Sequence, residues 1–138
     1  MSRRGDGGQV TAFVATMMLA LFVMAGLVID GGYALAARRR AIDEANGAAR
    51  AGAQAVDLAA YRSTGAFRLD PDGAIAAAHA YLARTGHEGT VTIVGDRVQV
   101  RVGVSQPMAL LRVVGIDELT VSGRGEAREL RGAGSSVP

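Results

Sequence analysis

Few side chains in this sequence could carry out chemistry. The chain has two histidines, His79 and His87, and no cysteine, so thiolate metal sites and thiol catalysis are excluded. Asp70, Asp72 and Gly73 loosely resemble the start of a calcium-binding loop, but no acidic residue follows at the closing position. The sequence also lacks a Gly-x-Ser-x-Gly elbow, a phosphate-binding loop and a metal-spaced His/Asp/Glu cluster. We therefore expect no catalytic residue, no metal or other cofactor, and no small-molecule substrate.

The basic residues do not form the pattern of a nucleic-acid-binding surface. All 15 are arginine, and they are spread from Arg3 to Arg131 in a chain with three Phe, three Tyr and no Trp. A nucleic-acid-binding domain clusters its basic side chains and interleaves aromatic ones. The composition, with a net charge of +2, argues against nucleic acid as a partner.

The longest uncharged stretch organises the rest of the chain. It covers residues 9–29, QVTAFVATMMLALFVMAGLVI, with Arg3, Arg4 and Asp6 before it and Asp30 after it. At ~1.5 Å of rise per residue, a helix of this length crosses a hydrocarbon core of ~30 Å. Lipid offers no partner for peptide groups, so a spanning segment must be helical. We predict a transmembrane helix over residues 9–29.

A cleaved secretory signal is the competing interpretation. Ala34-Leu35-Ala36 would be its cleavage site, but signal cores are shorter and Asp30 would lie between the core and that site. With the anchor retained, the predicted organisation has four parts. They are a short N-terminal segment or leader at 1–8, the membrane helix at 9–29, a domain at 30–131 and a flexible tail at 132–138.

Within the membrane helix, small residues recur every four positions at Ala12, Thr16 and Ala20. This spacing places them on one side of a helix, where they form a ridge on which a second transmembrane helix can pack closely. An alanine-rich composition produces the same spacing without any packing role, and both interpretations stay open.

Two helices are predicted after the membrane run. The first covers Gly31 to Tyr61, continuous with the anchor or bent at Gly31-Gly32, and ends at Ser63-Thr64-Gly65. Its small-residue stripe comprises Ile42, Ala45, Ala49, Gly52, Val56 and Ala59. The second helix runs from Pro71 to Thr85, with Asp70 as N-cap and Gly86 at its end. Its buried face is predicted to be Ile75, Ala78, His79 and Leu82.

From Thr90 the hydrophobic period changes to two, which is typical of strands. TVTIV and RVQVRVGV flank Gly95-Asp96, and a two-residue turn there predicts an antiparallel hairpin. The predicted pairs are Val94–Arg97, Ile93–Val98, Thr92–Gln99 and Val91–Val100. This register places the alternating valines and Ile93 on one face.

A third strand is predicted after Pro107, a helical turn over Met108–Val113 and Gly115. It covers Leu119–Glu129, and its inward residues are predicted to be Leu119, Val121, Gly123, Gly125 and Ala127. Inward glycines indicate close backbone approach, with the small-residue helix as the candidate neighbour. The fold class is therefore α+β, with a three-stranded antiparallel sheet covered by helix on one face.

Two blocks of the sequence resemble a known family. GDGGQVTAFVATMMLALFVMAGLVIDGGYALAARRRAIDEANGAARAGAQAVD looks like TadE/TadG-like proteins of Tad (tight adherence, Flp-type) pilus systems. The segments AYLARTG, GTVTIVGDRVQVRVGV and ALLRVVGIDELTVSGRGEAR are similar to the C-terminal part of the same family. The resemblance implies a membrane-anchored minor pilin or pseudopilin-like component. Its implied partners are other pilin-like subunits and pilus platform proteins, with the N-terminus in the cytoplasm and the domain outside.

One position departs from the pattern of that superfamily. Its prepilins are typically cut after a glycine by a prepilin peptidase and carry Glu at the fifth mature position. A cut after Gly8 would place Phe13 there, and residues 9–29 contain no acidic residue. A processed form beginning at Gln9 and a permanently anchored form both stay open. An alternative of another class is a membrane-tethered sensor or binding module, whose sign would be a polar pocket or an exposed aromatic cluster.

Overall fold

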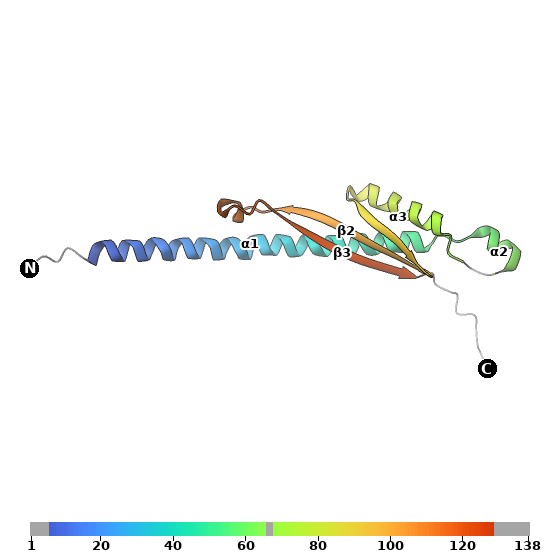
Figure 1. The fold of residues 1–138 in the computed structure, drawn as a ribbon, viewed down its shortest axis with the longest axis horizontal. Helices are drawn as coiled ribbons and strands as arrows, with labels where there is room; N and C mark the ends of the chain where they lie inside the picture. Colours follow the sequence, from blue (N-terminus) through green and yellow to red (C-terminus); the bar gives the residue numbers. More distant parts are fainter. Residues whose placement is uncertain (1–5, 66–67, 129–138) are drawn as a thin grey trace, which may run out of the picture. The chain divides into compact units, whose positions relative to one another are not determined.

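The computed structural model describes residues 6–65 and 68–128, and these form helices and one open sheet (Figure 1). The elements in chain order are α1 (Asp6–Ala53), α2 (Leu58–Thr64), α3 (Pro71–Thr85), β1 (Gly89–Val94), β2 (Arg97–Pro107), the 3-10 helix η1 (Leu111–Val114) and β3 (Glu118–Arg128). The strands are ordered β1-β2-β3, with antiparallel neighbours. The expected α+β class with a small three-stranded sheet is confirmed.

The chain divides into two compact units. Of the described residues, one unit comprises 6–36 together with 106–119, and the other comprises 37–65, 68–105 and 120–128. The first half of α1 therefore groups with the η1 segment, and the second half groups with α3 and most of the sheet.

The second half of α1 presents a narrow stripe of alanines. The helix continues through Gly31 and Gly32 without a break, and beyond them its buried positions step by three and four residues. In the second unit these positions are Ala37, Ala41, Ala45, Ala48, Ala49 and Ala53. The last four of these alanines form the core cluster together with Ala74, Ala78 and Leu82 of α3 and Val98, Val100 and Val102 of β2. Because alanine is short, the backbones around this core lie close together.

Two glycines of β3 lie directly on α1, as the sequence predicted. A Cβ atom at Gly123 would overlap the peptide group joining Ala41 to Ile42, and one at Gly125 would overlap that joining Ala45 to Asn46. Both glycines are buried. The small residues of the helix and of the strand are therefore two sides of one contact. Leu119, which was also predicted to point inward, is instead exposed.

The predicted helix from Gly31 to Tyr61 is wrong at its C-terminal end. α1 ends at Ala53, and the chain then runs extended, so that Val56 forms a bridge with Leu69. The side chain of Asp57 accepts hydrogen bonds from the N–H groups of Ala59 and Ala60 (3.0 and 2.9 Å) and thereby starts α2. Tertiary pairing and a new N-cap outweigh the helix propensity of the alanines here.

α3 has the predicted bounds, with Pro71 at its start and Gly86 in the left-handed conformation after its end. Its predicted face is wrong by part of a turn, because His79 is exposed and the buried residues are Ala74, Ala78 and Leu82. A Cβ at Gly52 of α1 would lie 2.9 Å from the Ala74 carbonyl oxygen. Such an approach requires the small residues of α3, not an imidazole, on the side facing α1.

The β1–β2 hairpin has the predicted register at every pair. Val94 lies opposite Arg97, Ile93 opposite Val98, Thr92 opposite Gln99 and Val91 opposite Val100. Gly95 adopts φ 64, which a two-residue hairpin turn requires and glycine supplies without strain. Burial alternates along β2, with Val98, Val100 and Val102 inside. The turn and the alternation thus specify one register.

Candidate functional site

The first half of α1 offers a long apolar surface that is exposed at every position from residue 8 to residue 25. Within residues 6–65 and 68–128, this is the one helix long and apolar enough to cross a membrane. Its exposed large side chains are Val10, Phe13, Val14, Met17, Met18, Leu19, Leu21, Phe22, Val23, Met24, Leu27, Val28 and Ile29. A water-soluble core helix would bury such residues. The exposure on all sides from residue 8 to residue 25 indicates single-pass membrane anchoring.

The predicted ridge lies on this exposed surface. Ala12, Thr16 and Ala20 are all solvent-exposed along one side of α1. The Thr16 hydroxyl donates a hydrogen bond of 2.9 Å to the Ala12 carbonyl oxygen one turn earlier, so it needs no partner outside the helix. The predicted cleavage position after Gly8 also lies within α1, near its beginning. The roles of the ridge and of this position stay predictions.

Asp30, the first residue after the apolar run, accepts hydrogen bonds from the loop that follows β2. Its Oδ1 accepts a hydrogen bond from the N–H of Ala109 (2.9 Å), and its Oδ2 accepts from Leu110 (2.9 Å) and Leu111 (2.7 Å). Among the residues that the structure describes, Asp30 is the one fully buried charged side chain. A carboxylate in this position is tolerated because backbone donors surround it.

The same hydrogen bonds determine the charge state of Asp30. The N–H of Leu111 makes the largest contribution to lowering the pKa of the carboxyl below its usual value of 3.8. Removal from water acts in the opposite direction and raises the pKa, while the N–H groups of Ala109 and Leu110 add to the lowering. Asp30 is therefore ionised at neutral pH, and the loop is held by a charge-assisted contact that we call the Asp30 clamp.

Sequence reasoning treated Asp30 only as the border of the membrane run. Its partners lie about 80 residues later and are backbone N–H groups, which leave no mark in the sequence. A weak signal was present in the small residue one turn earlier, Gly26. A Cβ there would lie 3.2 Å from the Cβ of Leu110 and 3.6 Å from Cδ2 of Leu111, so glycine allows the loop to approach the helix.

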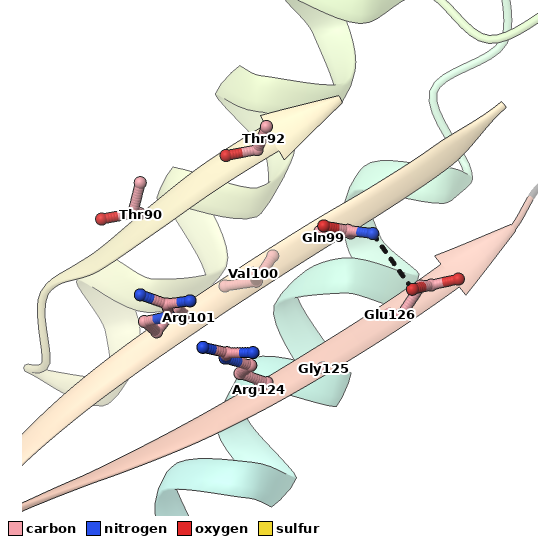
Figure 2. Close-up of a pocket in the computed structure, with 8 residues that line it drawn as sticks. All are labelled: Thr90, Thr92, Gln99, Val100, Arg101, Arg124, Gly125 and Glu126. Atoms are coloured by element: carbon pink, nitrogen blue, oxygen red, sulfur yellow. Dashed lines mark hydrogen bonds between the residues drawn. The ribbon is translucent and has the colours of Figure 1, made fainter. Parts of the chain in front are cut away.

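The exposed face of the sheet carries a shallow polar hollow (Figure 2). Side chains of three strands line it, namely Thr90, Thr92, Gln99, Arg101, Arg124 and Glu126, with Val100 and Gly125 beside them. Arginine and hydroxyl donors suit an anionic or hydroxyl-bearing ligand. The hollow is the feature closest to the polar pocket expected of a binding module.

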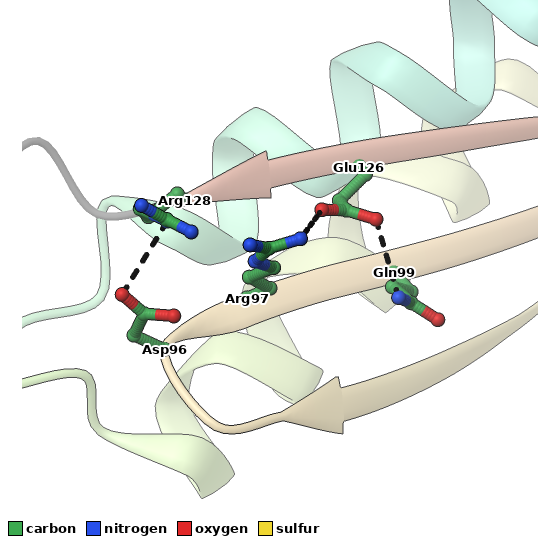
Figure 3. Close-up of polar contacts among 5 residues, drawn as sticks. All are labelled: Asp96, Arg97, Gln99, Glu126 and Arg128. Atoms are coloured by element: carbon green, nitrogen blue, oxygen red, sulfur yellow. Dashed lines mark hydrogen bonds and ion pairs between the residues drawn. The ribbon is translucent and has the colours of Figure 1, made fainter.

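Polar contacts cross from β2 to β3 at the edge of this hollow (Figure 3). Arg97 Nη1 donates to Glu126 Oε1 (2.9 Å), and Gln99 Nε2 donates to Glu126 Oε2 (3.2 Å). Arg128 Nε lies 3.4 Å from Asp96 Oδ2 in the turn. These exposed pairs contribute little stability each, and they occupy both oxygens of Glu126.

The two imidazoles have separate surroundings. His79 is exposed on α3, whereas His87 lies before β1 with its Nδ1 2.9 Å from Glu44 Oε2 of α1. Within the described part of the chain, no three His, Asp or Glu side chains are grouped so that they could hold a metal ion.

Residues 8–62 match a family model described as putative Flp pilus-assembly TadE/G-like. The resemblance noted for the N-terminal block is thereby confirmed over those residues, which contain most of α1 and the start of α2. The match supports involvement in the assembly of Flp/Tad pili and interaction with other pilus components in the membrane. No curated protein and no solved structure matches the chain.

Proposed function

We propose that this chain is a membrane-anchored minor pilin-like or pseudopilin-like component that assists the assembly of a Tad/Flp-type pilus. Its N-terminus lies in the cytoplasm, and its α+β domain lies outside the membrane. Its partners are other pilin-like subunits and the platform proteins of the pilus machine. It works by helix packing and not by catalysis.

One observation carries the proposal. The segment that matches a pilus-assembly family, residues 8–62, contains the apolar part of α1, whose large side chains from Val10 to Ile29 are exposed. In a pilus system such a helix has two possible surroundings, the lipid bilayer and a bundle of like helices. Both require an apolar surface, and close bundling additionally requires small residues.

The ridge of Ala12, Thr16 and Ala20 supplies those small residues. Its members are exposed, and the one hydroxyl among them is already hydrogen-bonded to the helix backbone. A neighbouring helix can therefore approach without leaving an unsatisfied polar group in the membrane. We assign this ridge as the contact with another pilin-like helix.

We favour a permanent anchor over a bulk fibre subunit. The fifth position after a cut at Gly8 is Phe13, and the apolar run has no carboxylate that would need a partner in lipid. The chain then nucleates or stabilises pilus assembly from the membrane. A mature N-terminus at Gln9, found by mass spectrometry, would favour the processed pseudopilin instead.

Deletion of the gene tests the function. We expect surface pili to be reduced or lost, while the major pilin is still made and inserted in the membrane. Restoring the full-length chain from a plasmid should restore the pili. Normal piliation in the deletion strain would contradict the assembly role.

A matched pair of substitutions tests the ridge. Ala20→Leu adds bulk to the ridge, whereas Ala25→Leu adds the same bulk about 140° away around the helix, at ~100° per residue. Both positions are exposed, so neither change should disturb the domain. We expect lost pili with Ala20→Leu and normal pili with Ala25→Leu. Equal piliation of the two strains would contradict helix packing through the ridge.

The hollow on the sheet supports a second candidate, a membrane-tethered binding module for an anionic envelope ligand. Arg101 and Arg124 line the hollow from neighbouring strands (Figure 2). Replacing both by glutamine removes its cationic donors without touching the core. Normal pili in that variant, together with a lost response to an envelope ligand, would favour the binding module.

A further inference from the structure

The loop between β2 and β3 lies beside the last turn of the membrane run. Leu110 and Leu111 pack against Gly26. A Cβ atom added at Gly26 would lie 3.2 Å from the Cβ of Leu110 and 3.6 Å from Cδ2 of Leu111. Gly26 precedes Asp30 by four residues, which is ~6 Å along the helix. If residues 9–29 span a bilayer, as the proposed function requires, this loop is at the depth of the bilayer surface or below it.

The loop exposes apolar side chains at that depth. Val113 is 89% exposed, and Val114, Ile116 and Leu110 are each exposed by 40% or more. Arg112 is the one charged residue between Met108 and Ile116. Apolar side chains grouped in this way are costly in water and favourable in the interfacial layer of a membrane.

The backbone of the loop can also enter an apolar environment, because most of its N–H groups are hydrogen-bonded within the chain. Of the nine N–H groups of residues 108–116, seven donate hydrogen bonds within the chain: three to the Asp30 carboxylate and four to backbone carbonyls. The four are Met108 to Asp117, Val113 to Leu110, Gly115 to Arg112 and Ile116 to Leu111. Irregular backbone enters the apolar layer only when its polar groups are satisfied internally.

We propose that residues 110–116 form a second membrane contact, an apolar loop that the Asp30 clamp holds in the interfacial layer of the leaflet on the domain side. Its partner is the glycerol and upper acyl-chain region of the phospholipids. We choose lipid over a protein partner because the loop packs against the spanning helix at Gly26. The loop is therefore surrounded by the same medium as that part of the helix. The contact fixes the rotation and depth at which α1 leaves the membrane.

The absence of cysteine from the chain allows a direct test with single-cysteine variants. Full-length Val113→Cys is labelled with an environment-sensitive fluorophore and reconstituted in vesicles of phosphatidylethanolamine and phosphatidylglycerol. The vesicles contain a phospholipid with a nitroxide at acyl carbon 5 as quencher. Val28→Cys, exposed in the last turn of the span, serves as the membrane reference. Arg39→Cys, about 15 Å further along α1 than Ile29, serves as the aqueous reference.

We expect lipid quenching at Val113 to approach that at Val28 and to exceed that at Arg39 by about twofold or more. A Val113 probe that is open to aqueous iodide and not quenched by lipid would overturn the contact. A probe shielded from both quenchers would also overturn it and would indicate a protein partner. Loss of quenching at Val28 as well would overturn the membrane span, and with it the proposed function.

The clamp is tested in the same vesicles. Asp30→Ala in the Val113→Cys background removes the acceptor of three loop N–H groups, and we expect quenching at Val113 to fall toward the aqueous reference. Quenching at Val28, measured in its own Asp30→Ala background, should not change. Unchanged quenching at Val113 would overturn the role of the clamp in holding the loop.

Discussion

Gly125 of β3 lies so close to Ala45 of α1 that a single added methyl group would overlap the Ala45 carbonyl carbon. The strand and the helix therefore meet backbone to backbone, and α1 is more than a stalk that leads to the domain. It forms one wall of the domain core.

Gly125→Ala should consequently be destabilising by about 1–3 kcal/mol, since overpacking a rigid backbone contact forces strand and helix apart. Gly103→Ala on β2 is the matched control, because a Cβ there meets nothing within 4 Å. Urea unfolding of the full-length protein in detergent, followed by circular dichroism, measures both. Similar midpoints for the two variants would contradict the close contact.

The two faces of the hairpin can be separated in the same assay. Val100→Asp places a carboxylate in the core next to Val98 and Val102 and should cost on the order of 4 kcal/mol. Thr92→Asp adds the same group on the exposed face of the neighbouring strand and should cost less than about 1 kcal/mol. If both changes lowered the midpoint equally, the assignment of the faces would be wrong.

The Asp30 clamp predicts a particular dependence on pH. The folded-state pKa of Asp30 lies below its usual value of 3.8, so the folded state binds fewer protons than the unfolded state does. The stabilisation is then fully present above the usual pKa and is lost as the pH falls through the folded pKa. A carbon-13 titration of the Asp30 carboxyl in micelles should give a midpoint below 3.8. A midpoint above that value would contradict the three hydrogen bonds.

The membrane anchor is tested by membrane fractionation and by mass spectrometry of the recovered protein. Full-length protein should stay with membranes after carbonate extraction, because an apolar helix spans the bilayer. Its mass should show that residues 9–36 are retained. A soluble product that begins after Ala36 would contradict the anchor and restore the signal-peptide interpretation, and the cut would then fall in the middle of α1.

The accuracy of the sequence predictions depended on how local the determining contacts are. The β1–β2 register was predictable because Gly95-Asp96 and the valine alternation lie within a dozen residues of each other. The glycines of β3 were predictable for a similar reason, since Gly123 and Gly125 alternate with exposed polar residues. The end of α1 was missed because Val56 pairs with Leu69, and that long-range bridge competes with a strong local helix preference.

The candidate site was the least predictable part. His79 was placed inward because the periodicity of α3 allows either face, and only the tight approach to Gly52 decides between them. The Asp30 clamp was not predicted, since a carboxylate beside an apolar run usually marks a membrane border. Its three partners are peptide N–H groups of Ala109, Leu110 and Leu111, which any residue except proline would provide.

The separation between Asp30 and its loop has a consequence for biogenesis. Asp30 leaves the ribosome about 80 residues before Leu111 does, since their sequence separation is 81. In the proposed topology the Asp30 carboxylate is exported before its partners and is hydrated until they follow, and a charge at that point resists sliding of the new helix back through the bilayer. When the loop after β2 has followed in this topology, the N–H groups of Ala109, Leu110 and Leu111 replace that water. In this topology the same side chain first opposes back-sliding of the helix and later binds the loop that follows β2.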